Sequence, residues 1–295
     1  MNKLLSKSII TLTSFIVALS LLATTVTISP EIFAQTNLSS MQPSANISQD
    51  STGPSPSSSI QLPTTQQQVD AVATSQPCLE TKTDRTPQQT EGPYFVDEML
   101  NRSDIRSDPS DGSVQDGIPL RLIIHIHDFG RNGSCTPLKG AHVDIWHANS
   151  QGLYSDIQQA GTEGKKYLRG FQVTDDNGTV QFTTIYPGWY QGRTVHIHIK
   201  VRTLEGPEKS FDWTSQLYFN DSITNEVHTQ DPYSHHGFPD TRNSQDGIYT
   251  GSSLDGLVQA NSGTRLMVNL NKDKQGSYLG IFDVLLDSGQ QQPAQ

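Results

Sequence analysis

Residues 167–201 read YLRGFQVTDDNGTVQFTTIYPGWYQGRTVHIHIKV, and the fold class can be inferred from this stretch. Apolar and polar residues alternate in 170–174 and in 179–183, and the Asp176-Asn177-Gly178 turn between these runs favours a tight hairpin. A third run of strand type follows at 195–201. Short strands joined by tight turns are typical of antiparallel sheets.

The same pattern continues on both sides of this stretch. Further strands are expected at 120–124, 141–146, 215–219, 266–270 and 278–286. Helical periodicity is scarce, and strands do not alternate with helices as they do in parallel βαβ units. The sequence therefore predicts an all-β fold, an antiparallel β-sandwich with long loops.

The N-terminal residues 1–34 have the pattern of an export signal. Two lysines precede a long apolar stretch, and a small residue, Ala34, stands at a plausible cleavage point. An uncleaved membrane anchor is the alternative, because the apolar stretch is nearly long enough to span a bilayer. Both alternatives predict a secreted or extracytoplasmic protein, and the second predicts one that is tethered to the membrane.

Residues 35–77 are rich in Ser, Thr, Gln and Pro and carry little charge. Such a segment cannot bury enough apolar surface to offset the entropy of ordering, so a disordered linker is expected. A short disordered tail is expected at 289–295. Residues 78–288 remain as a single folded domain, which is long enough for a buried core.

The net charge of the chain limits the kinds of partner that it can bind. The net charge of −10 argues against nucleic acid, because no basic patch could neutralise phosphates, so a small molecule is the expected partner. Membrane contact is expected only through an uncleaved N-terminal segment.

Cys78 and Cys135 could pair in an oxidising compartment, with metal ligation as the weaker alternative. The sequence does not define an oligomeric state.

Two pairs of histidines have the spacing that places both imidazoles on one face of a strand. His125 and His127 have no tyrosine, cysteine or carboxylate cluster beside them, so a structural role is expected. His196 and His198 follow the turn YPGWYQGR at 186–193, which brings a tyrosine and an arginine to the start of the strand. The arginine, Arg193, can join the histidines only through an irregular approach to the strand.

Four ordered blocks resemble the intradiol ring-cleavage dioxygenases, the family of catechol and protocatechuate dioxygenases. They are TPQQTEGPYF at 86–95, GAHVDIWHANSQGLYSD at 140–156, the stretch 167–201 and SQLYFND at 215–221. The domain from about Cys78 to Asp287 is similar to the extracellular single-chain branch of that family. The resemblance implies the β-sandwich of the intradiol dioxygenases and a catalytic domain at 78–288.

The resemblance also implies a ligand set and catalytic groups. A non-haem ferric ion would be held by Tyr154, Tyr190, His196 and His198. Tyr190 matches the ligand that the substrate displaces and whose oxygen takes up a substrate proton. Arg193 and Gln216 match the residues that stabilise negative charge on the bound substrate. The expected activity is cleavage of a catechol ring between its two hydroxylated carbons by O2, which gives a muconate-type diacid.

Further residues are expected around the substrate. Gly92 and Pro93 match family positions that line the pocket, and Tyr94 and Trp189 could supply aromatic walls. Plain core packing of these residues is the alternative. His147 could donate a hydrogen bond that orients one of the metal ligands, although it is not expected to bind the metal itself.

The residue types agree with this chemistry independently of the family. Two phenolates and a hydroxide balance the charge of ferric iron, and hard anionic oxygen ligands favour that oxidation state. A zinc hydrolase would be expected to use His, Cys or carboxylate ligands instead.

Two other functions are compatible with parts of the sequence. A non-catalytic, transthyretin-like binding module at the cell surface would explain the turn at 174–178 and the PGWY motif at 187–190, but not the set of tyrosines, histidines, arginine and glutamine. An enzyme on the same scaffold with another metal or substrate is the second alternative, either a hydrolase or a dioxygenase for larger phenols.

Overall fold

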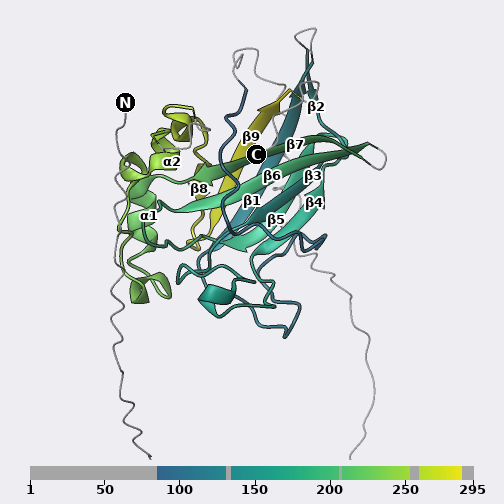
Figure 1. Cartoon of the computed structure of the whole chain (residues 1–295). Coiled ribbons are helices and arrows are strands. Elements are labelled where there is room, and N and C mark those ends of the chain that lie inside the picture. The colour runs from purple at the N-terminus through teal and green to yellow at the C-terminus, as the bar shows by residue number, and fades with distance from the viewer. Residues whose placement is uncertain (1–84, 131–133, 206–207, 253–258, 288–295) are drawn as a thin grey trace, which may run out of the picture. The chain divides into compact units, whose positions relative to one another are not determined.

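The computed structural model describes residues 85–130, 134–205, 208–252 and 259–287, which form a β-sandwich (Figure 1). The strands are β1 (Pro119–Phe129), β2 (Cys135–Pro137), β3 (His142–Trp146), β4 (Arg169–Val173), β5 (Thr179–Ile185), β6 (His196–Glu205), β7 (Glu208–Tyr218), β8 (Asn269–Lys272) and β9 (Tyr278–Leu286). Each strand that the sequence pattern predicts overlaps an observed strand, and the all-β sandwich is confirmed.

Several sequence predictions lie outside the described residues. They concern the leader at 1–34, the linker at 35–77, the tail at 289–295 and Cys78, the expected partner of Cys135. Cys135 itself begins β2 and does not carry a free thiol. Among the described residues, no helix is both long and apolar enough to cross a bilayer.

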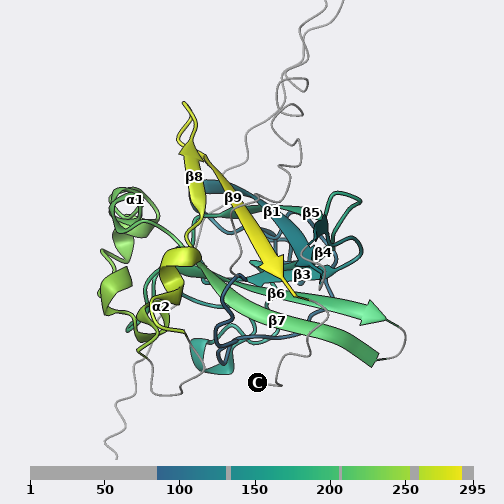
Figure 2. The ribbon, with the colours of Figure 1, turned by 90° about the horizontal axis from the view of Figure 1, so that it is seen from above.

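The two sheets form the layers of the sandwich, as Figure 2 shows from above. One sheet has the order β2-β1-β9-β8, and β5 also pairs with β1; the other has the order β4-β3-β6-β7. β2 and β5 pair with different parts of β1, at 127–129 and at 119–125. The named strands pair antiparallel except β1 and β9, whose parallel pairing the sequence pattern did not predict.

Strand β6 is buried on both faces, and each face has a different chemistry. Ile197, Ile199 and Val201 belong to the hydrophobic core between the sheets. Because side chains alternate along a strand, residues 196, 198, 200 and 202 share the opposite face. They are two histidines, a lysine and an arginine, and each is less than 10% exposed.

The polar face of β6 is covered by residues 86–102, here called the N-terminal segment. Near its start, Gln89 N donates to Thr214 O of β7 at 3.0 Å, and near its end Phe171 N of β4 donates to Leu100 O at 2.8 Å. The segment therefore crosses this sheet from one edge to the other. Two ion pairs hold it to β6, Glu91 with Lys200 and Asp97 with Arg202.

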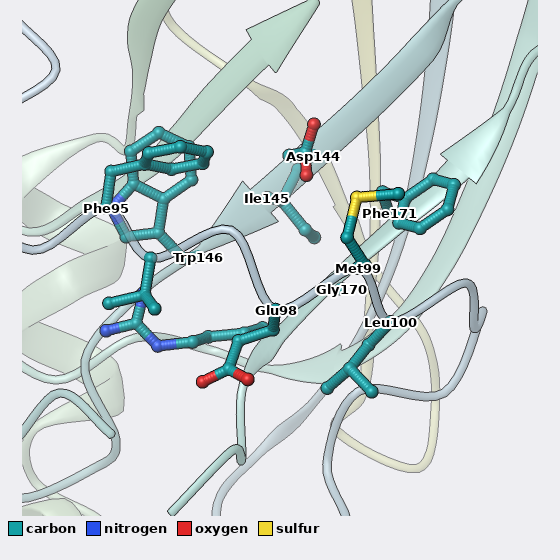
Figure 3. Close-up of a pocket in the computed structure, with 11 residues that line it drawn as sticks. Phe95, Glu98, Met99, Leu100, Asp144, Ile145, Trp146, Gly170 and Phe171 are labelled. Atoms are coloured by element: carbon teal, nitrogen blue, oxygen red, sulfur yellow. The ribbon is translucent and has the colours of Figure 1, made fainter. Parts of the chain in front are cut away.

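Aromatic packing completes the contact between the N-terminal segment and the sheet. Phe95 lies against Trp146 of β3, with 4.9 Å between the ring centroids. Figure 3 shows the segment from Phe95 to Leu100 passing over Trp146 and Phe171. The space left at this contact is a cavity of only about 10 Å³, which is about the size of one water probe.

The start of the N-terminal segment is also tied to the end of β9. Thr86 N donates to Leu285 O at 2.9 Å, and Leu285 N donates to Thr86 Oγ1 at 2.8 Å. The two ends of the described domain are therefore joined directly by hydrogen bonds.

The connection between β7 and β8 contains short helices that the sequence pattern did not predict. They are α1 (Asp221–Val227), α2 (Gly247–Thr250), η2 (Tyr233–His235), η3 (Asn243–Gln245) and η4 (Ser262–Arg265); a further 3₁₀ helix, η1 (Gln158–Ala160), lies between β3 and β4. The α1 helix begins after Asn220, whose side chain accepts a hydrogen bond from Ser222 N. Both α helices lie to one side of the sheets (Figures 1 and 2).

Loss of the Arg202 guanidinium is expected to destabilise the domain. Arg202→Met would remove the guanidinium that contacts Asp144 at 2.8 Å and also pairs with Asp97 on a covered face. The expected decrease in the free energy of unfolding is about 3–5 kcal/mol, measured by urea denaturation. In the control Arg106→Met, an exposed pair with Asp104 is lost and about 0–1 kcal/mol is expected. Equal effects of the two variants would refute a structural role of the covered charges.

Candidate metal centre

Four side chains that the sequence analysis singled out meet at the polar face of β6. His196 Nε2 lies 3.1 Å from His198 Nε2, and it lies 3.4 Å from the Oη atoms of both Tyr154 and Tyr190. The histidines come from β6, Tyr154 from the loop after β3, and Tyr190 from the loop between β5 and β6. Two imidazole nitrogens and two phenol oxygens at these distances could share one metal ion.

The two histidines are held in different ways. His196 Nδ1 donates to Thr194 O at 2.6 Å, which leaves the Nε2 lone pair directed to the tyrosines. His198 Nδ1 is buried and has no hydrogen-bond partner among the described residues. Its ring is instead stacked on Trp146, at 4.8 Å and 5° between planes.

Gly92 of the N-terminal segment lies against His198. Its φ of +72° is in the left-handed region that favours glycine, and a Cβ added here would lie 3.5 Å from His198 Cε1. The structure thus places Gly92 beside a candidate ligand. Gly92 is not among the residues that line the cavity beside Tyr154 and Tyr190.

Tyr154 is held by two buried groups. Thr162 Oγ1 donates to Tyr154 O at 2.6 Å. Arg169 donates through Nη2 to Ser155 O and through Nη1 to Tyr94 O, each at 2.6 Å. The Tyr94 ring is stacked on Tyr154 with 4.5 Å between centroids. Arg169 therefore joins the N-terminal segment to the Tyr154 loop, a role that the sequence analysis missed.

Gly152 allows the loops of Tyr154 and Tyr190 to meet. A Cβ at Gly152 would lie 2.1 Å from Trp189 O, which is closer than atoms can approach, and the φ is +80°. Only glycine fits at this position without moving one of the two loops.

Arg193 reaches the centre from the turn before β6. This is the irregular approach to the strand that the sequence predicted. Its Nη1 donates to Tyr190 Oη at 3.3 Å, and its Nη2 donates to Gln216 Oε1 at 2.5 Å. Gln216 lies opposite His198 in the β6 and β7 register, and its Nε2 donates to Thr90 O at 3.1 Å. Arginine and glutamine thus form one hydrogen-bonded unit beside Tyr190.

Asp246 is the counter-ion of Arg193, and the sequence did not predict it. Its fully buried carboxylate accepts from Arg193 Nε at 2.8 Å and from Thr194 N at 2.9 Å through Oδ2, and from Ile248 N at 2.8 Å through Oδ1. Asp246 is 53 positions from Arg193, so no local sequence pattern connects them. The local sequence around it, Asp246-Gly247, indicates only a turn or the start of a helix and not an ion pair.

Burial sets the charge states of the centre when no metal is bound. Burial raises the pKa of Tyr154 well above its ordinary value, and it also raises the pKa of Tyr190, so both phenols are neutral. Burial and the nearby Arg193 lower the pKa of His196 to about 3, so its nitrogen is available to a metal. Burial alone would lower the pKa of Arg193, but Tyr190 and Asp246 raise it above its ordinary value.

A cavity of about 540 Å³ opens beside the two tyrosines. The described residues that line it are Pro93, Tyr94, Gly152, Leu153, Tyr154, Ile157, Gln159, Ala160 and Tyr190. Tyr190 lines the cavity and also contacts Arg193, which is not a lining residue. The phenol of Tyr190 therefore separates the cavity from the pair of Arg193 and Gln216.

Other singled-out residues lie away from the centre. Trp189 was expected in the pocket wall, but its ring packs on His236 at 4.4 Å and its Nε1 donates to Gly237 O. The absence of side chains at Gly188 and Gly152 lets the backbone at 188–189 lie directly against the loop at 149–152, and this contact positions the Trp189 ring. His147 bonds to Ala148 O and Thr184 Oγ1 and not to a candidate ligand.

The first histidine pair has no part in the centre, as expected. His125 Nδ1 contacts Asp283 Oδ1 of β9 at 2.8 Å, and His127 lies on the same strand. Among the described residues, no group of three or more His, Cys, Asp or Glu side chains could hold a metal. A metal centre on this part of the chain therefore depends on the tyrosines.

Comparison with known proteins gives concordant matches. A family model described as "Dioxygenase" matches residues 90–233. Catechol 1,2-dioxygenase of Acinetobacter baylyi is 36% identical over 110 residues, which are 36% of this chain and 32% of that protein. Hydroxyquinol 1,2-dioxygenase of a Rhizobium species is 41% identical over 54 residues, which are 18% of each chain. The chain thus aligns with less than half the length of these curated relatives.

A solved structure matches over nearly its whole length. It is an intradiol ring-cleavage dioxygenase from Tetranychus urticae, with 29% identity and a TM-score of 0.59. The alignment covers 71% of this chain and 98% of that chain.

Removal of the Asp246 carboxylate is expected to destabilise the domain by about 3–5 kcal/mol. In Asp246→Ala, the buried guanidinium of Arg193 would lose its counter-ion and several donors would lose their acceptor. Urea denaturation measures the loss. The matched control is Asp240→Ala, which removes an exposed carboxylate that accepts from Gly192 N, and at most about 1.5 kcal/mol is expected. An Asp246→Ala protein as stable as this control would show that the pair is not needed.

Proposed function

The chain belongs to the intradiol ring-cleavage dioxygenase family, and on that basis we propose that it opens catechol rings between their hydroxylated carbons with O2. The family uses non-haem iron, and the product would be a muconate-type diacid. One observation carries the proposal: Tyr154, Tyr190, His196 and His198 converge from three separate parts of the chain.

The four residues fit a ferric ion by their chemistry. Phenolate oxygens are hard anionic ligands, and the imidazoles of this centre are neutral, as metal coordination requires. A bound ferric ion would supply the positive charge that ionises phenol and catechol oxygens and would couple the electron-rich ring to O2. The ligands would be Tyr154, Tyr190, His196 and His198.

The two tyrosines are positioned for different roles. Tyr154 is 4% exposed and its loop is fixed by Thr162 and Arg169. Tyr190 is only half-buried and faces the cavity. A catechol entering from the cavity would therefore replace Tyr190, and the Tyr190 Oη would accept a proton from a substrate hydroxyl.

Arg193 would then face the substrate in place of Tyr190. Its Nη1 already points to the position of the Tyr190 oxygen, and Asp246 keeps the guanidinium fixed from the other side. Gln216 accepts from Nη2 and so fixes the second arm of the guanidinium. A preorganised cation of this kind stabilises negative charge that builds up on the ring during oxidation.

The binding-module alternative is not favoured. A non-catalytic sandwich has no need for a buried arginine that is aimed at a tyrosine and fixed by a buried carboxylate. Export of the enzyme is a separate proposal, and it is supported only by the composition of residues 1–34.

Tyr154→Phe is expected to lower the content of bound iron and the rate of ring cleavage. Loss of one of four ligands would weaken iron binding, and the visible absorption of an iron-bound phenolate would fall together with the iron content. Iron analysis, the visible spectrum and O2 uptake with catechol are the measurements. The control is Tyr278→Phe, a buried tyrosine of β9 in the core between the sheets, which should keep iron and activity. Full activity of Tyr154→Phe would eliminate this centre.

Arg193→Gln is expected to lower kcat about 10²–10³-fold while iron remains bound. The variant loses a cation that acts on the reacting ring but keeps the four ligands. Steady-state kinetics with catechol and the iron content separate the two effects. The control Arg121→Gln, which changes an arginine of β1 bonded to Gln181, should retain wild-type kcat. An unchanged kcat in Arg193→Gln would exclude this role.

A further inference from the structure

The cavity beside Tyr154 and Tyr190 is larger than a catechol ring needs. Its volume of about 540 Å³ lies within the range of about 300–1,000 Å³ found for sites that enclose drug-sized ligands. A single ring with two hydroxyls would therefore leave much of the cavity unfilled. The lining residues that are not candidate ligands come from the loop at 152–160 and from Pro93 and Tyr94.

The wall along that loop is apolar. Leu153, Ile157 and Ala160 come from the loop, and Pro93 faces them from the N-terminal segment. Leu153 is 42% exposed, although a leucine is stabilised by about 1.5–3 kcal/mol when it is fully buried. An apolar group in the cavity would cover this side chain.

None of the described lining residues carries a charge. Apart from the tyrosine hydroxyls, the polar side chain among them is the neutral amide of Gln159. A carboxylate in this part of the cavity would lose its hydration without gaining a cation. An uncharged substituent would avoid that cost.

The cations closest in sequence to this wall are already paired. Lys165 Nζ contacts Asp111 at 2.7 Å, and Lys166 Nζ contacts Glu98 at 2.5 Å. Arg169 donates to the backbone oxygens of Tyr94 and Ser155. Drawing any of them to a substrate carboxylate would break these contacts.

We propose that the site selects uncharged catechols that carry a bulky alkyl or aryl substituent, over catechols that carry a carboxylate. The inference rests on the proposed function, because it assumes that the catechol oxygens bind at the tyrosine and histidine cluster. Ring substituents then occupy the apolar part of the cavity, between Pro93 and the loop at 152–160.

Binding and turnover test the inference separately. Calorimetry of the iron-loaded protein without O2 gives Kd values for catechol, 4-tert-butylcatechol, 3,4-dihydroxybenzoate and its methyl ester. The ester should bind at least tenfold more tightly than the acid, and 4-tert-butylcatechol at least as tightly as catechol. Binding of the acid as tight as that of the ester overturns the inference. If the preferred ligands bind but no ring is opened in air, the selectivity stands and the proposed reaction fails.

A charge placed on the wall supplies a second test. Gln159→Arg should increase the affinity for 3,4-dihydroxybenzoate relative to its methyl ester at least tenfold, because the new guanidinium faces the cavity. Gln158→Arg adds the same charge at an exposed neighbouring position that does not line the cavity, and it should leave the ratio within about twofold. Equal ratios in the two variants would show that the substituent does not reach this wall.

Discussion

The strict alternation of side chains along β6 determines how the domain and its metal centre are built. One face of the strand carries Ile197, Ile199 and Val201 into the core. The other face carries two imidazoles followed by Lys200 and Arg202. A shift of register by one residue would exchange the two faces, so the packing of the core also fixes the position of the histidines. The polar face needs a cover, and the N-terminal segment provides one through carboxylates.

Buried charge is tolerated around this centre because each group has a partner. Arg193 is held between Asp246 and Gln216, and Arg169 is held by backbone oxygens of two loops. Such groups contribute little net stability, because the free energy needed to remove them from water is about as large as the free energy gained by pairing them. Their effect is to fix orientation. Two candidate ligands lie on β6 and two on separate loops, and the paired arginines hold these loops against the strand.

Local sequence patterns were sufficient for the strands but not for the roles of the site residues. Alternation predicted the strands, and the spacing of His196 and His198 placed both on one face, while the roles of Tyr154 and Gln216 came only from the family resemblance. Features that depend on distant contacts were not predictable. The parallel pairing of β1 with β9, the helices after β7 and the ion pair of Asp246 join residues far apart in sequence, and no local pattern encodes such partners.

The hydrogen bonds between Thr86 and Leu285 have a consequence for biogenesis. They tie the beginning of the N-terminal segment to the last strand, so this end of the segment is anchored only after β9 has been synthesised. The complete cover over the histidines would accordingly form only in the finished fold, in whichever compartment folding ends.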